Sequence, residues 1–98
     1  MSLYKERESG DEAARILNSP VWAEAWSACR ARIIEEYEAA PSNATDTVMH
    51  LKRLLTACTL ARAHLERIMN EGKVAAASIE FDDKRKVSNI GALRPAGR

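Results

Sequence analysis

A histidine, a glutamate and an arginine lie close together in the segment LARAHLERIMNEGKVAAAS, which covers residues 60–78. Side chains of these types can bind a metal or transfer protons when they share one face of a helix. His64, however, has no histidine or cysteine three or four positions away, and His50 lies about 21 Å along the same predicted helix. Glu66 and Arg67 fall opposite the apolar stripe of that helix. We therefore interpret the segment as a solvent-exposed helix surface and not as a site.

Two other groups of residues have the chemistry for a site but lack the surroundings that a site needs. The carboxylates of Glu35, Glu36 and Glu38 lie within about one helical turn, with no apolar surroundings to raise a pKa. The acids at 82–83 adjoin the bases at 84–86 and are expected to neutralise them. The chain has no phosphate-binding glycine loop and no nucleophile motif. We expect no catalytic residue, no metal, no cofactor and no small-molecule substrate, so the sequence does not predict an enzyme.

Capping signals predict where the helices begin. The run Ser9-Gly10-Asp11-Glu12 fits a capping box and predicts a short helix from about Gly10 to Asn18. Ser19-Pro20 predicts the start of a second helix, because serine caps well and proline fits the first helical position. That helix ends near Pro41 and carries an apolar stripe at helical spacing, formed by Trp22, Trp26, Cys29, Ile33 and Tyr37.

A longer third helix has the strongest apolar pattern in the chain. Its stripe alternates spacings of three and four and consists of Leu51, Leu54, Cys58, Ala61, Leu65, Ile68 and Gly72. Gly72 followed by Lys73 is typical of a helix C-terminus. The segment 74–86 fits either a short fourth helix or an extended strand-like segment. From Val87 onward, the glycine, proline and serine content predicts an arm without regular structure.

These elements predict an all-α fold: an antiparallel helical hairpin preceded by a short N-terminal helix, with an irregular basic C-terminal arm. The expected division is an N-terminal arm at 1–8, a hairpin domain at 9–76, and a short helix or extended segment with a basic tail at 77–98. A turn near Pro41 places Trp26 opposite Ala57 and Cys58 and brings Arg62 over Trp22. The two cysteines are offset in this register, so no disulfide is expected within one chain.

The charge of the chain is unevenly distributed although the net charge is only +1. Residues 84–98 carry five bases and no acid, so this tail could bind nucleic acid or an acidic protein surface, or could serve solubility alone. The expected contact residues of the tail are Lys84, Arg85, Lys86, Ile90, Leu93, Arg94 and Arg98. No apolar run is long enough to span a bilayer and the first residues are charged, so we expect a cytosolic protein without membrane contact.

The combination of a capped short helix, ILNSPVWAEAW, a long helix ending ARAHLERIMNEGKVA and a polar tail resembles small all-helical proteins of tailed bacteriophages and prophages. Genes for such proteins lie among those for head assembly and DNA packaging. The resemblance covers residues 10–76. It implies a non-catalytic part in virion assembly, with phage structural proteins as partners, in the bacterial host cytoplasm or the virion.

The helix lengths predict an oligomer or a docked complex. In the predicted hairpin the far end of the third helix extends beyond the second, and the short first helix covers only part of that surface. The expected interface residues are Ile16, Leu17, Leu65, Ile68 and Met69. The sequence thus predicts a phage structural or assembly protein. The alternative is a small DNA-binding or regulatory protein that uses the basic tail.

Overall fold

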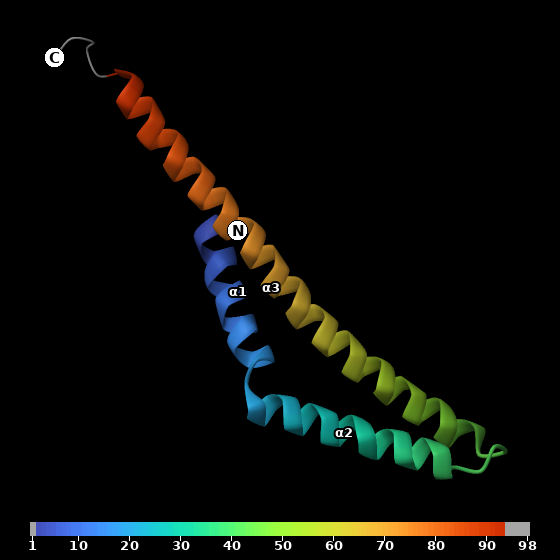
Figure 1. Cartoon of the computed structure of the whole chain (residues 1–98). Coiled ribbons are helices and arrows are strands. Elements are labelled where there is room, and N and C mark those ends of the chain that lie inside the picture. Colours follow the sequence, from blue (N-terminus) through green and yellow to red (C-terminus); the bar gives the residue numbers. More distant parts are fainter. Residues whose placement is uncertain (1, 94–98) are drawn as a thin grey trace.

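Three helices make up the computed structural model, which describes the backbone of residues 2–93 and the side chains of residues 2–87. Helix α1 spans Leu3–Leu17, α2 spans Pro20–Ala39 and α3 spans Thr45–Leu93 (Figure 1). The predicted all-α class is confirmed, and the described residues contain no strand.

Serines cap the first two helices. The cap of α2 is at the predicted residue, and the cap of α1 is not. The Ser19 hydroxyl accepts from the backbone N–H of Trp22 at 3.4 Å, with Pro20 in the first turn, as the sequence predicts. Ser2, and not Ser9, caps α1, and its hydroxyl accepts from the N–H of Lys5 at 3.2 Å. The expected N-terminal arm at 1–8 is therefore helical from Leu3. The reason is that both serines are good caps, and the earlier one allows a longer helix.

Gly72 does not end a helix, which corrects the predicted boundary. Helix α3 continues through it for a total of 49 residues, so the segment 74–86 is neither a separate fourth helix nor extended. The arm predicted to be irregular from Val87 is helical as far as Leu93, while 94–98 lie outside the described residues. Gly72 is buried, because at this position the backbones of α1 and α3 come into contact.

Helix α1 packs on the middle of α3 in the opposite direction (Figure 1). A Cβ placed on Gly10 would lie 2.6 Å from the Cα of Gly72 and 3.2 Å from the carbonyl oxygen of Ile68. A Cβ on Gly72 would lie 3.1 Å from the carbonyl oxygen of Glu6. From the contact of Gly10 with Ile68 to the contact of Glu6 with Gly72, the residue numbers fall along α1 and rise along α3. The two helices are therefore antiparallel. Two helices can approach this closely only where neither has a side chain.

Helix α2 connects the end of α1 to the start of α3; it lies nearest α3 at its C-terminal end and farthest from it where it joins α1 (Figure 1). The predicted proximity of Trp26 and Cys58 is confirmed, because the indole N–H of Trp26 donates to the carbonyl oxygen of Cys58 at 3.2 Å. No residue of α2 is buried, and two members of its predicted apolar stripe, Cys29 and Tyr37, are exposed. The contact between α2 and α3 is therefore narrow.

The core of the described residues is small. Its buried apolar side chains are Ala13, Leu51, Ala75 and Ile79. The principal extents are 84 × 24 × 16 Å, and the radius of gyration is 22.9 Å, compared with about 13 Å for a compact domain of this length. An elongated chain with so little buried apolar surface depends mainly on local helical hydrogen bonds and the contact between α1 and α3.

Candidate functional site

The histidine, glutamate and arginine of the 60–78 segment lie on the exposed surface of α3. Arg67 Nη2 lies 2.6 Å from Nδ1 of His64, one helical turn away. Glu66 instead pairs with Arg62, whose Nε donates to Oε1 at 3.1 Å. These are ordinary contacts between side chains three and four positions apart on a helix. They form two separate pairs and not one cluster.

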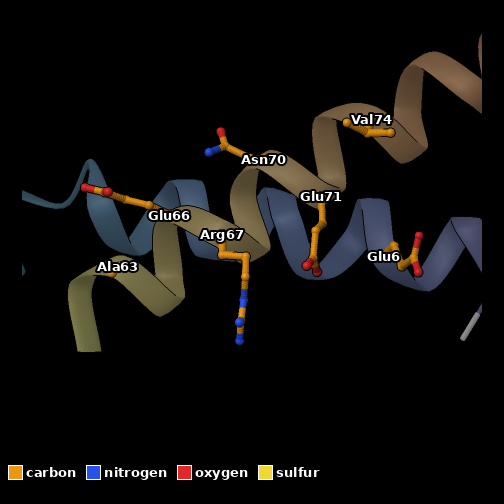
Figure 2. A pocket seen from close by; sticks show the side chains of 7 residues that line it. All are labelled: Glu6, Ala63, Glu66, Arg67, Asn70, Glu71 and Val74. Atoms are coloured by element: carbon orange, nitrogen blue, oxygen red, sulfur yellow. The ribbon is translucent and has the colours of Figure 1, made fainter. Parts of the chain in front are cut away.

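A shallow hollow beside these residues is lined by Glu6, Ala63, Glu66, Arg67, Asn70, Glu71 and Val74. Figure 2 shows that its side chains spread outward from the helix and do not converge on a common point. Arg67 and Glu71 extend to one side of α3, whereas Asn70 and Val74 extend to the other. A binding site for a small molecule is normally concave and brings a few polar groups together, which this hollow does not.

Among the described residues, no group of three histidine, cysteine, aspartate or glutamate side chains lies close enough to hold a metal ion. No helix in the described part of the chain is both long enough and apolar enough to cross a membrane.

The tryptophans form an aromatic cluster between α2 and α3. The rings of Trp22 and Trp26 stack with their centroids 6.2 Å apart. The guanidinium of Arg62 lies 4.9 Å from the ring centroid of Trp26, and that of Arg30 lies 5.9 Å from it. The predicted cation–π contact of Arg62 is therefore made with Trp26 and not with Trp22. The reason is that Trp26 reaches the backbone of Cys58, one turn from Arg62, and Trp22 stacks behind it.

The expected interface residues are half-buried and lie on the helices that pack against each other. They are Ile16 and Leu17 near the end of α1 and Leu65, Ile68 and Met69 in α3. Of this set, Ile68 lies at the contact with α1, since its carbonyl oxygen would be 3.2 Å from a Cβ placed on Gly10. Helix α1 thus covers a share of the apolar surface that a partner was expected to cover.

The described part of the basic tail is helical and exposed. Lys84 Nζ lies 3.1 Å from Glu80 Oε1, and Arg85 Nη2 lies 3.8 Å from Asp82 Oδ1. Lys86 is exposed as well. The side chains of Ile90 and Leu93 and the residues Arg94 and Arg98 lie outside what the structure describes.

Sequence reasoning did not single out several large apolar side chains that the structure leaves in solvent. Leu60, Val74 and Phe81, all on α3, are 64%, 68% and 65% exposed. Their spacing in multiples of seven residues was visible in the sequence, but the stronger stripe on the other face of α3 concealed it. No protein-family model, curated protein or solved structure matches this chain.

Proposed function

We propose that this chain is a non-enzymatic structural or assembly protein that oligomerises, or docks on a larger complex, through its helical faces. The proposal takes α2 and α3 as an antiparallel hairpin, with α1 packed on the part of α3 beyond it. The hydrogen bond from Trp26 to the carbonyl of Cys58 supports that register.

One observation carries the proposal: the chain buries few of its large apolar side chains. Four apolar residues are buried among those described, and two of the four are alanines. By contrast, ten large apolar side chains are exposed, among them Leu60, Val74 and Phe81 on α3. Covering three side chains of this size contributes about 1.5 to 3 kcal/mol each, so a partner that covers them gains substantial free energy.

The resemblance to tailed-phage proteins gives the proposal its biological setting. In that setting the chain belongs to head assembly or DNA packaging, and its partners are copies of itself or other phage structural proteins. It acts in the host cytoplasm or within the virion. A long helix with exposed apolar side chains suits this role, because assembly proteins bind broad surfaces and not small ligands.

The DNA-binding alternative has less support from the described residues. Two of the three bases at 84–86 are already close to acids of the same helix, Lys84 to Glu80 and Arg85 to Asp82. Each such pair reduces the charge available to phosphates. Phosphate contacts dominate affinity for DNA, so the described tail offers a weak electrostatic attraction.

The absolute mass of the chain in solution tests the proposal. Multi-angle light scattering should give a mass above the 10.9 kDa of one chain, rising with protein concentration. A gel-shift titration with salt tests the alternative in parallel. A chain that stays monomeric, binds no phage structural protein and retards DNA with a steep salt dependence would contradict the proposal and favour the DNA-binding role.

A further inference from the structure

One face of α3 carries a seven-residue repeat that nothing in the described chain covers. Leu60, Arg67, Val74 and Phe81 follow one another at intervals of seven, and all four are exposed. Ala63, Asn70 and Ala77 each follow three positions after one of these residues and are exposed too. Together these seven residues form the heptad stripe, with the a and d spacing of a helix that packs against another helix.

The heptad stripe lies on the side of α3 that faces away from α1. Gly72, Ala75 and Ile79 are buried, and Gly72 touches α1 directly. At 3.6 residues per turn, Phe81 points about 200° away from Ile79 around the helix. Helix α1 therefore leaves the stripe exposed, although Glu6 of α1 lines the same hollow as four of its residues, Ala63, Arg67, Asn70 and Val74.

We propose that two copies of this chain pair through their heptad stripes, with the two α3 helices antiparallel and a two-fold axis between Ile68 and Met69. This inference rests on the proposed function and names its partner and its surface. Four features support this pairing: the sizes of the facing side chains, their charges, a hollow for Phe81 and the position of the axis.

The sizes of the facing residues match in this register. Leu60 of one copy faces Ala77 of the other, and Ala63 faces Val74, so that in both layers a large side chain meets a small one. In the central layers the helix position of Arg67 faces that of Asn70, and the Arg67 side chain, which Figure 2 shows on the other side of α3 from Asn70, must turn to reach it. Polar residues at such positions fix the register and number of helices in a coiled coil. Because the axis is two-fold, every layer occurs twice.

The charges beside the stripe also match. Glu66 of one copy faces Lys73 of the other, and His64 faces Glu71, again twice each. All four side chains are exposed, although Glu66 also pairs with Arg62 and His64 contacts Arg67 within the same helix. Opposite charges at these flanking positions determine the orientation of paired helices.

Two other arrangements of the same stripe bring like charges together. A parallel pair places Arg67 against Arg67 and Glu66 against Glu71. An antiparallel pair shifted by one heptad places Lys73 against Lys73 and Glu66 against Glu80. Like-charge contacts at such positions destabilise the pairing, so the charges beside the stripe favour the proposed register over these two arrangements.

Phe81 has a hollow to occupy in this register, because it faces Thr56 of the second copy. The hollow is lined by Tyr37, Lys52, Leu55, Thr56, Thr59 and Leu60. Tyr37, at the end of α2, adds an aromatic side to it.

Beyond Phe81 the register brings Lys84 toward Arg53, so we place the end of the contact at the layer of Phe81 and Thr56. Lys84 is neutralised by Glu80 of its own chain.

The two-fold axis nearly coincides with the midpoint of α3. The helix runs from Thr45 to Leu93, so its centre is Met69, within one residue of the axis. Two copies paired in this way lie side by side around the middle of α3, and the layers in contact, from Thr56 to Phe81, span about 39 Å at 1.5 Å per residue. A shifted register leaves part of each long helix without a neighbour.

Two single charge reversals and their mixture test the pairing. Glu66→Lys alone places lysines against lysines, and Lys73→Glu alone places glutamates against glutamates, so each variant should self-associate about tenfold more weakly than the native chain. An equimolar mixture restores both opposite-charge pairs in the mixed dimer. Sedimentation equilibrium should therefore show two weakly associating variants that pair with each other at near-native strength. Both positions are exposed, and circular dichroism checks that each variant is folded.

The outcomes separate this inference from the proposed function. A parallel pair would be strengthened by Glu66→Lys, since a lysine would then face Glu71, and that result overturns the antiparallel register. Native oligomers that neither reversal weakens would overturn the heptad stripe as the interface and leave the proposed function standing. A native chain that stays at 10.9 kDa at hundred-micromolar concentration overturns the dimer. In that case only docking on a different protein survives from the proposed function.

Discussion

A single methyl group at Gly10 should push α1 and α3 apart. In Gly10→Ala the new Cβ would lie 2.6 Å from the Cα of Gly72. Non-bonded carbon atoms pack at about 3.5 to 4.0 Å, so the two backbones must separate by about 1 Å at this point. The atom in the way belongs to the backbone and cannot move aside as a flexible side chain would. The separation also loosens the neighbouring buried contacts of Ala13 and Ala75.

The magnitude follows from two opposing effects. Overpacking a tight contact costs about 1 to 3 kcal/mol. Alanine also favours a helix over glycine by about 1 kcal/mol, and Gly10 lies within α1. The net free energy of unfolding should therefore fall by about 1 kcal/mol. For a chain of this size that lowers Tm by roughly 4 to 8 °C.

Thermal unfolding followed by circular dichroism measures the effect. Ser9→Ala is the matched control, because Ser9 is exposed in the same helix and the change adds helix propensity without a clash. We expect the control to be neutral or slightly stabilising. A higher Tm in Gly10→Ala than in the native chain would show that the helices do not touch at Gly72, and would refute the packing described above.

Three further predictions concern other parts of the structure. Trp26→Phe removes the hydrogen bond to the carbonyl of Cys58 and should lower the free energy of unfolding by about 0.5 to 1.5 kcal/mol, measured by urea denaturation against the native chain. Both cysteines are free, so a thiol reagent should label two thiols in the native chain. The exposed Cys29 should react faster than the half-buried Cys58, and a single slow thiol would contradict this. Removing residues 84–98 should shift Tm by no more than about 2 °C, because a free helix end contributes little packing, and a large drop would show that this segment supports the fold.

Local chemistry made some features of the fold predictable. Ser19 and Pro20 fix the start of α2 through their own backbone preferences, so no knowledge of the tertiary structure was needed. The position of Trp26 relative to Cys58 follows from the turn near Pro41 and the helical rise, which act over a short stretch of chain.

Gly72 shows where sequence reasoning fails. A glycine followed by a lysine is consistent with a helix end and equally with a close contact between two helices. Which of the two applies depends on whether another backbone lies against it. Here Gly10, far away in the sequence, supplies that backbone. Glycine and alanine recur around Gly10 and around Gly72, and this pattern could have indicated a close helix contact. It does so only once the two segments are known to lie against each other.

The sequence also could not show which face of α3 is available to a partner. Helix α3 has apolar residues on two faces, and the sequence does not say which of them α1 covers. The expected interface at Leu65, Ile68 and Met69 follows the stronger stripe, which the structure places half-buried. The weaker stripe, with Val74 and Phe81, is the one left in solvent.

Mass and maximum dimension measured together on one sample test the central claim most directly. Small-angle X-ray scattering with in-line light scattering provides both quantities for the native chain. Antiparallel pairing about the midpoint of α3 predicts twice the 10.9 kDa of one chain, with a maximum dimension that stays near 84 Å. A mass of 10.9 kDa at every concentration, or a dimer much longer than a single chain, would contradict the account.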